Sequence, residues 1–212
     1  MKRFIVVAGN IGVGKSSLVM LLSRRLGYQA FLEPEADNPY LEDFYQDMSA
    51  WSFHSQVFFL ARRLRILVGI IHQPMPAIQD RSIYEDAEVF AYNLYLQGTM
   101  GQRDYQTYHD LYQSLVDFLP PPDLVIYLRA SVDTLHERIS QRARGYERDI
   151  SREYLQRLNQ LYGLWISNFS VCPVLTVPAD DLDFVAQPDH LELIAQKVEE
   201  KLAGKEEVSF DL

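Results

Sequence analysis

Five short runs of apolar residues recur along the chain with the length and composition of buried β-strands. They cover residues 4–8, 28–32, 77–79, 124–128 and 174–177. Each run is brief, and most are rich in Val, Ile or Leu, which is typical of parallel strands covered on both faces. We therefore predict a five-stranded parallel sheet.

Helical patterns separate these runs. Apolar positions recur at helical spacing over residues 15–26, 38–48, 52–72, 84–97, 105–118, 132–142, 152–168 and 188–202. Three consecutive prolines at 120–122 break the chain before the fourth strand. Strand and helix thus alternate, which predicts the α/β class with helices flanking the sheet. We expect one domain over residues 1–203 and a disordered polar tail over residues 204–212.

Composition narrows the kind of protein. A chain of 212 residues with 48% hydrophobic residues fits one globular domain with a full core. The net charge of -9 argues against a nucleic-acid polymer as partner, because that binding needs an excess of Lys and Arg on one face. No apolar stretch reaches the roughly 18 residues of a membrane span. The single cysteine, Cys172, excludes an intramolecular disulfide, and with no leader evident we expect a cytoplasmic protein.

A phosphate-binding loop follows the first predicted strand. Its residues are Gly9-Asn10-Ile11-Gly12-Val13-Gly14-Lys15-Ser16, with Ser17 next. The strand before it and the helical pattern after it complete the P-loop context. Glycines let backbone N–H groups turn toward the β-phosphate, and the helix N-terminus adds partial positive charge. Lys15 can reach the β- and γ-phosphates and Ser16 can ligate Mg²⁺, so the loop predicts a site for ATP or another triphosphate with Mg²⁺.

Other motifs narrow the class of P-loop protein. The chain lacks the Asp-x-x-Gly switch and the Asn/Thr-Lys-x-Asp guanine reader of regulatory GTPases, and the acidic pair of motor-type ATPases. Glu33 follows the second strand and Asp80-Arg81 the third, so all three should converge on the P-loop at the carboxyl ends of the strands. Asp80 can hold Mg²⁺ and Arg81 can touch the transferring phosphoryl group. Glu33 could accept a proton from an attacking hydroxyl, or could be an exposed loop carboxylate.

An arginine cluster follows the fourth strand. Arg138 and Arg142 are four positions apart on one helical face, and Arg144 comes just before Gly145. Arginines that end a helix and enter a glycine loop suit a lid that closes over a triphosphate. A solvated basic face is the alternative interpretation. In an acidic protein the cluster favours the lid.

These motifs, taken in order, resemble the deoxynucleoside kinase family, which includes deoxycytidine, deoxyguanosine and insect multisubstrate kinases. The resemblance spans nearly the whole chain. It rests on the P-loop, Glu33-Pro34, Tyr45, Trp51-Ser52-Phe53-x-x-Gln56, Asp80-Arg81-Ser82-x-Tyr84-x-Asp86, Ile126-Tyr127-Leu128-Arg129-Ala130 and the arginine cluster. Each motif alone is weak, but their order and spacing match together.

The resemblance implies a role for each motif. Glu33 is expected to be the general base on the 5′-hydroxyl, with Arg81 beside it and Lys15 on the phosphates. Asp80 stands where the family usually has glutamate. Gln56 is expected to read the base with its amide, and Phe90 to stack on the base. Tyr45 and Glu147 are expected to hold the 3′-hydroxyl. The lid arginines on the phosphates would be Arg138, Arg142 and Arg144. The family also implies a homodimer.

The base preference depends on a predicted Arg63–Asp86 pair. Arg63 lies two helical turns after Gln56, and the pair resembles the cytosine- and purine-accepting branch of the family. An ordinary buried ion pair is the alternative. Asn38 stands where the family often has tryptophan, and Phe59 is bulkier than the alanine of cytidine-specific enzymes. The stretch 38–45 is similar to bacterial deoxyadenosine and deoxyguanosine kinases, which favours a purine.

Three functions remain in competition. The first is a kinase that transfers the γ-phosphoryl of ATP to the 5′-hydroxyl of a deoxynucleoside in nucleotide salvage, with a deoxycytidine-preferring or multisubstrate enzyme as a variant. The second is a thymidylate-type nucleotide kinase, which would want an extra arginine near Glu33. The third is a non-catalytic nucleotide-binding regulator. It would leave Glu33, Tyr45 and Gln56 without a joint purpose.

Overall fold

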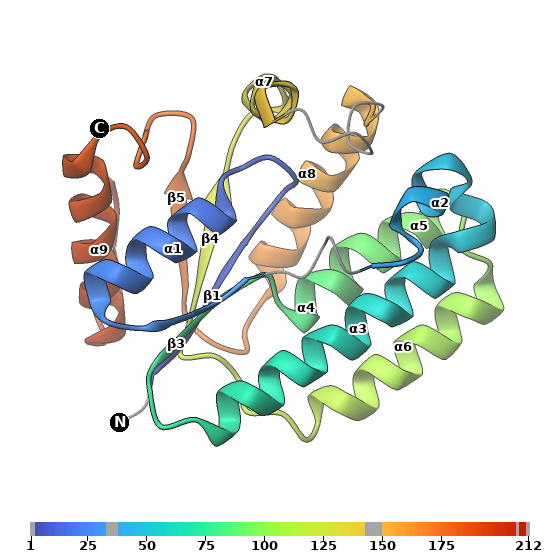
Figure 1. Cartoon of the computed structure of the whole chain (residues 1–212), viewed down its shortest axis with the longest axis horizontal. Coiled ribbons are helices and arrows are strands. Elements are labelled where there is room, and N and C mark those ends of the chain that lie inside the picture. Colours follow the sequence, from blue (N-terminus) through green and yellow to red (C-terminus); the bar gives the residue numbers. More distant parts are fainter. Residues whose placement is uncertain (1–2, 33–37, 143–149, 207, 211–212) are drawn as a thin grey trace.

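A five-stranded parallel sheet organises the protein. The computed structural model describes residues 3–32, 38–142, 150–206 and 208–210. The strands lie in the order β2-β3-β1-β4-β5 (Figure 1). Their bounds are Phe4–Gly9 for β1, Gln29–Phe31 for β2, Ala77–Asp80 for β3, Leu124–Arg129 for β4 and Val174–Pro178 for β5. The sheet predicted from the apolar runs is therefore confirmed, and β1 lies at its centre.

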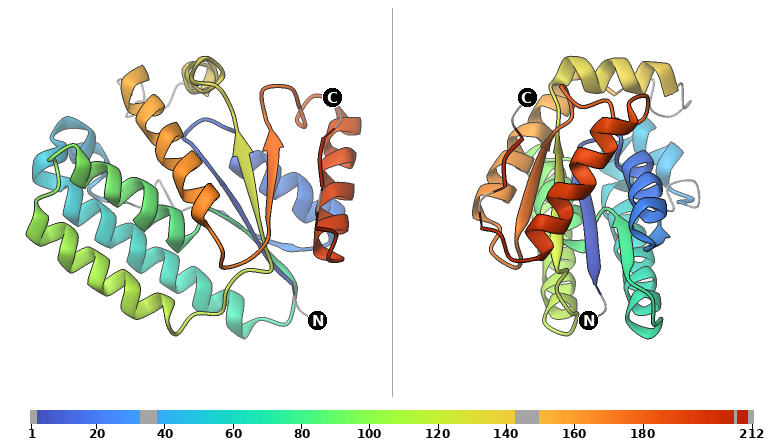
Figure 2. Two further views of the ribbon diagram at one scale, coloured as in Figure 1. Left: turned by 180° about the vertical axis from the view of Figure 1, so that it is seen from behind. Right: turned by 90° about the vertical axis from the view of Figure 1, so that its left-hand side faces the viewer.

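Helices cover both faces of this sheet. On one face lie α1 (Lys15–Leu26) and α9 (Pro188–Leu202), and on the other lie α3 (Met48–His72) and α8 (Arg152–Asn168) (Figures 1 and 2). Helix α7 (Val132–Arg142) crosses above the carboxyl ends of the strands (Figure 2). The remaining helical segments are α2 (Leu41–Gln46), α4 (Ile83–Glu85), η2 (Asp86–Ala91), α5 (Tyr92–Leu96) and α6 (Gln102–Val116).

The core lies between the central strands and the helices on both faces. All six residues of β1 are buried, as are the first five of β4. Helix α8 contributes one buried stripe at helical spacing, made of Tyr154, Leu155, Leu158, Leu161, Tyr162 and Trp165. Removal of this apolar surface from water is the main force that holds the layers together. It also fixes the strand ends against one another. Among the described residues, no helix combines the length and apolarity needed to cross a bilayer.

Several predicted bounds differ from the structure. Helix α3 begins at Met48 rather than at 52, because the Asp47 side chain accepts hydrogen bonds from the N–H groups of Ser49 and Ala50 and caps the helix. The helix predicted over 84–97 is divided into α4, the π-helix η2 and α5. The second strand has three residues, Gln29–Phe31, and pairs only with β3 among the described strands. The other helix bounds agree with the prediction to within about three residues.

Candidate active site

The P-loop connects β1 to α1 and fits tightly between β4 and α7. Gly9 has a φ of 145°, and a Cβ atom there would lie 2.7 Å from the carbonyl oxygen of Leu128. Gly12 has a φ of 81°, and a Cβ there would lie 2.7 Å from Cγ1 of Ile139 on α7. Both positions combine left-handed backbone with close packing, so they require glycine. The loop is thereby pressed against its neighbours.

One backbone carbonyl and one side chain of α8 hold the loop on its other side. Asn10 Nδ2 donates to Leu155 O at 3.0 Å and to Asn159 Oδ1 at 2.8 Å. Asn10 Oδ1 accepts from the Ile11 N–H at 2.7 Å, while Lys15 Nζ donates to Asn10 O at 2.9 Å. The sequence prediction placed Asn10 among the ATP-binding residues of the loop and missed Asn159. Helix α8 therefore fixes the shape of the loop from behind.

A pocket of about 330 Å³ opens in front of the loop. It brings together most of the predicted triphosphate-binding residues and adds a segment that sequence reasoning missed. The lining consists of Ile11, Gly12, Gly14, Lys15, Ser16, Ser17, Arg81, Arg138, Gln141, Arg142, Leu182, Asp183, Phe184 and Val185. Residues 182–185 follow β5, so the rule that ligands bind beyond the carboxyl ends of strands could have found them.

Two oxygen-bearing side chains meet at the edge of this pocket. Ser16 Oγ donates to Asp80 Oδ2 at 2.5 Å. Asp80 ends β3, and the β1–β3 register places it beside Val7, just before the P-loop. A hydroxyl and a carboxylate are oxygen ligands of the kind that Mg²⁺ prefers. The two residues predicted to hold the metal therefore lie together.

The predicted lid arginines are placed only in part. Arg138 Nη1 donates to Val13 O at 3.0 Å and Nη2 to Ala179 O at 2.8 Å, so this side chain ties the P-loop to the end of β5. Arg142 lines the pocket from the end of α7. Arg144 lies outside the described residues, as do Glu33 and Glu147. The lid thus stays a prediction.

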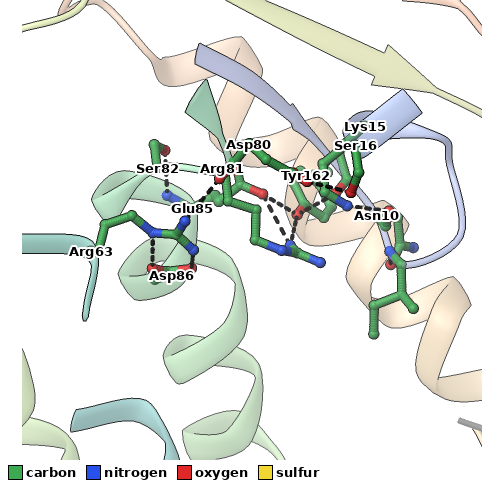
Figure 3. A network of polar contacts seen from close by, with 12 residues as sticks. Asn10, Lys15, Ser16, Arg63, Asp80, Arg81, Ser82, Glu85, Asp86 and Tyr162 are labelled. Atoms are coloured by element: carbon green, nitrogen blue, oxygen red, sulfur yellow. Dashed lines mark hydrogen bonds and ion pairs between the residues drawn. The ribbon is translucent and has the colours of Figure 1, made fainter. Parts of the chain in front are cut away.

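Arg81 is the arginine that lies deepest in the pocket. Its backbone is left-handed, with a φ of 65°, and its N–H donates to Val7 O at 2.9 Å. Nη1 donates to Glu85 Oε1 at 3.1 Å and to the Tyr162 hydroxyl at 3.0 Å. The guanidinium carbon lies 4.4 Å from the centre of the Phe90 ring, within cation–π range. An uncommon backbone conformation and the contacts with Glu85, Tyr162 and Phe90 together set its direction, and Figure 3 shows the first two of these contacts.

Glu85 is a further residue of the site that sequence reasoning missed. Its side chain is fully buried, and burial raises its pKa to about 7, against the opposing effect of Arg81 and Lys15. Tyr162 lies against it with the hydroxyl 2.7 Å from Glu85 Oε1 and 2.8 Å from the Gly9 carbonyl oxygen. In the sequence, only the i,i+4 spacing from Arg81 could have indicated Glu85.

The predicted Arg63–Asp86 pair forms on the other side of Arg81. Arg63 Nε lies 2.9 Å from Asp86 Oδ2 and Nη2 lies 3.2 Å from Oδ1, a bidentate pair. Arg63 Nη1 also donates to Asp80 O at 2.8 Å. Both side chains are buried, with 1% and 5% of their surface exposed. The pair therefore links α3 and η2 to the end of β3 (Figure 3).

The remaining predicted acceptor residues lie on the helices around this pair. Gln56 is buried on α3, two turns before Arg63. Phe90 is half-buried between Arg81 and Tyr162, with its ring 6.2 Å from that of Tyr162. Tyr45 is half-buried on α2, 5.2 Å from the Phe44 ring. Their roles toward a nucleoside stay predictions.

Comparison with known proteins places the chain among kinases. Residues 5–203 match the family described as deoxynucleoside kinase. The chain is 41% identical over 196 residues to a deoxyadenosine/deoxycytidine kinase of Bacillus subtilis. The alignment covers 92% of this chain and 90% of that protein. It is 35% identical over 211 residues to a deoxyadenosine kinase of Lactobacillus acidophilus, which covers 95% and 97%.

Solved structures give the same result. The deoxyadenosine kinase from M. mycoides with bound dATP superposes with a TM-score of 0.82 at 34% identity. The alignment covers 92% of this chain and 99% of that one. The same enzyme with bound dCTP gives a TM-score of 0.80 at 35% identity, over 92% and 98% of the two chains.

Proposed function

The chain belongs to the deoxynucleoside kinase family, and we propose that it transfers the γ-phosphoryl of ATP to the 5′-hydroxyl of a purine deoxynucleoside in nucleotide salvage. Family membership makes it an ATP-dependent phosphotransferase that acts on deoxynucleosides. The observation that carries the proposal is the pocket that Lys15, Ser16 and Arg81 line together. A cation at the phosphates, a metal ligand and an arginine beside the acceptor are the parts that phosphoryl transfer needs.

The donor side is formed by the P-loop and its neighbours. Lys15 would contact the β- and γ-phosphates, with Arg138, Arg142 and Arg144 adding positive charge. Ser16 and Asp80 would hold Mg²⁺, since their oxygen atoms already lie 2.5 Å apart at the pocket edge. When bound, the ion would neutralise charge on the phosphates and orient them.

The acceptor side is formed by α2, α3 and η2. Glu33 would accept the proton of the 5′-hydroxyl, with Arg81 directed at the transferring phosphoryl group. Gln56 would read the base, Phe90 would stack on it, and Tyr45 and Glu147 would hold the 3′-hydroxyl. The buried Arg63–Asp86 pair would face the exocyclic edge of the base. The contacts of the pair fix both side chains. A base with the wrong exocyclic group would therefore leave hydrogen-bonding groups without partners and would bind more weakly.

A purine is the preferred base in this proposal. Relatives named deoxyadenosine or deoxyguanosine kinase support it. The B. subtilis relative whose name also includes deoxycytidine supports the multisubstrate alternative. Initial rates with the four deoxynucleosides and thymidylate, at one ATP concentration, separate these cases. We expect deoxyadenosine or deoxyguanosine to have the highest kcat/KM. Phosphorylation of thymidylate alone would overturn the assignment.

Glu33→Gln tests the proposed general base. The amide keeps the size of the side chain but cannot accept the proton, so kcat should fall by about 10²- to 10⁴-fold while ATP binding is kept. Single-turnover rates and the affinity for a non-hydrolysable ATP analogue measure the two effects. Undiminished turnover would remove Glu33 from this role.

The proposal includes the assembly and location of the enzyme. We propose a cytoplasmic homodimer. A lone cysteine suits a reducing compartment. Large apolar side chains on the surface suit a subunit contact, notably Leu164 on α8, which is 61% exposed. Light scattering on the purified chain measures the mass directly, and Leu164→Asp should shift it toward the monomer if α8 takes part. A wild-type monomer at micromolar concentration would contradict the dimer.

A further inference from the structure

The hydroxyl of Tyr162 lies near more acceptors than it can donate to. It receives a hydrogen bond from Arg81 Nη1 and lies 2.8 Å from Gly9 O and 2.7 Å from Glu85 Oε1. A tyrosine hydroxyl has one hydrogen, so it donates to only one of these two oxygen atoms. The other short contact requires a hydrogen from elsewhere. Gly9 O has none to give, but a protonated Glu85 has one.

Two arrangements of hydrogen atoms therefore fit the same side-chain positions. With Glu85 ionised, Tyr162 donates to Oε1, Arg81 binds the same oxygen, and the contact to Gly9 O carries no hydrogen. With Glu85 protonated, Glu85 donates to the Tyr162 oxygen and Tyr162 donates to Gly9 O in the P-loop. The ionised arrangement binds Arg81 as an ion pair. In the protonated arrangement, the neutral Glu85 carboxyl is only a weak hydrogen-bond acceptor for Arg81.

The charges around Glu85 decide between these arrangements. Glu85 Oε2 is buried and has no hydrogen-bond partner among the described residues, so a charge there is costly. The groups that face Glu85 are Lys15 from α1, Arg81 from the end of β3, Asp86 from η2, Tyr162 from α8 and Tyr127 from β4. Among the residues that the structure describes, Lys15 and Arg81 are the cations that act on Glu85, and both line the triphosphate pocket.

A triphosphate changes this balance because it brings several negative charges to the same two cations. Lys15 and Arg81 then compensate the phosphates, and Glu85 loses much of the positive potential that favours its ionised form. We propose that Glu85 is a positioning residue for Arg81: ionised, it holds the guanidinium in the empty enzyme, and when a triphosphate enters it takes up one proton and releases Arg81 to the phosphates. The inference rests on the kinase function and adds a regulated step to it.

The step takes one proton from solvent, which forms the O–H bond of the protonated Glu85 carboxyl, and no other covalent bond changes. Glu85 binds the proton and donates it in a hydrogen bond to Tyr162. Tyr162 turns its own hydrogen to Gly9 O, which adds a bond to the P-loop as the triphosphate arrives. Arg81 keeps its place over the Phe90 ring while its Nη atoms turn from Glu85 to the phosphates. Binding of the donor triphosphate thus turns Arg81 toward the phosphoryl group that will be transferred.

Proton uptake during binding tests the inference. Titration calorimetry with a non-hydrolysable ATP analogue and Mg²⁺ at pH 8, in two buffers of different ionisation enthalpy, gives the number of protons taken up. We expect the wild type to take up about half a proton or more beyond the value for Glu85→Gln. The glutamine amide fills the same space and donates to Tyr162 without titrating. Equal proton numbers in the two proteins would overturn the inference.

Kinetics provide an independent readout. In the wild type, kcat/KM for ATP should change between pH 6 and pH 8, and Glu85→Gln should flatten that profile while it still folds and turns over. Tyr162→Phe should lower kcat by about tenfold and leave KM for the nucleoside within about twofold. Parallel pH profiles in the wild type and Glu85→Gln would show that Glu85 has only a structural role.

A second tyrosine–glutamate pair supplies the matched control. Tyr112 on α6 and Glu88 line a different pocket from the P-loop, so Tyr112→Phe and Glu88→Gln should leave the proton count and the pH profile unchanged. An effect of these variants equal to that of Glu85→Gln would count against a specific role. A wild type that phosphorylates no deoxynucleoside would instead refute the proposed function. Proton uptake without turnover would still support the positioning role.

Discussion

Two tyrosine–glutamate pairs in this protein have the same chemistry and opposite surroundings. Tyr162 and Glu85 are both fully buried, and Arg81 donates to each. Tyr112 is buried, but its partner Glu88 is exposed on η2. Burial is the largest cause of the raised pKa of both tyrosines. At Glu85 burial also brings the carboxyl pKa to about 7, within the range where a cell's pH changes its charge.

The ion pairs repeat this contrast. Arg63 and Asp86 have 1% and 5% of their side-chain surface exposed, whereas Arg25 and Glu192, between α1 and α9, have 38% and 58%. The charged groups of a surface pair are hydrated in the folded and the unfolded protein, so the pair contributes little to the free energy of unfolding. When a buried pair loses one partner, the other charge stays buried away from water with nothing to compensate it. Burial, more than the identity of the residues, decides what each pair does.

Removal of Arg81 should have the largest effect. Arg81→Met takes away the cation that we direct at the transferring phosphoryl group, so kcat should fall by about 10³-fold or more. It also leaves Glu85 without its ion-pair partner. The measurement is a single-turnover rate, with thermal unfolding recorded in parallel.

The double variant Arg81→Met/Glu85→Gln separates the two effects. It should regain thermal stability relative to Arg81→Met, because no carboxylate remains buried at position 85 without its partner, and should stay as slow. Recovery of the rate together with stability would mean that Arg81 serves the fold rather than the transfer.

Removal of Arg63 should have the largest effect on stability. Arg63→Met leaves Asp86 buried without its partner, and the free energy of unfolding should fall by about 3–5 kcal/mol. Urea denaturation followed by circular dichroism measures it. Arg25→Met, at the surface pair, is the matched control and should not change the midpoint beyond experimental error. Similar losses in both variants would contradict the distinction between buried and exposed pairs.

Glu85 should give stability a pH dependence of its own. Its pKa is 4.5 ordinarily and about 7 in the folded chain, so the folded state binds more protons between these values. The free energy of unfolding should therefore fall as pH rises from about 4.5 to 7, by on the order of 3 kcal/mol, and this term should stay level above 7. Chemical denaturation at several pH values measures it. Glu85→Gln should lack this part of the slope. A slope unchanged by that substitution would mean that Glu85 titrates normally.

Substitution at the Tyr112–Glu88 pair should have the smallest effects on stability and rate. Tyr112→Phe removes one hydroxyl beside Glu88, at a cost of about 1 kcal/mol or less in the free energy of unfolding. Its kcat should equal that of the wild type. A loss of rate larger than that of Tyr162→Phe would reverse the comparison between the two pairs.

The sequence indicated the fold well because the fold follows from periodicity. Residues 15–26, 132–142, 152–168 and 188–202 were predicted as helices with the same bounds as in the structure. The bounds were wrong where one local contact decides them, as at the Asp47 cap of α3. The π-helix η2 could not be predicted, since its irregular turn depends on tertiary contacts rather than on spacing. The limits of the domain at 203 and of a disordered tail stay predictions.

The site was predicted in part, for a physical reason. Residues at strand ends, such as Asp80 and Arg81, could be placed because parallel strands share one carboxyl edge. The residues that were missed lie on helices among core positions: Glu85, Asn159 and Tyr162. A polar residue within an apolar stripe is not recognised from the sequence as part of a site. Tyr162 in particular occupies the spacing of Leu155, Leu158 and Trp165, so it resembled a core residue. Only the fold brings it to Gly9.

The left-handed backbone at Arg81 bears on how this enzyme should be engineered. Glycine and asparagine occupy such a conformation at lower energy than arginine. Because either residue also loses the ion pair with Glu85, a library screened for heat resistance alone would enrich them at position 81 together with Glu85→Gln, and would discard the arginine along with its activity. Directed evolution of a heat-stable variant needs a turnover screen in every round, or this codon held constant.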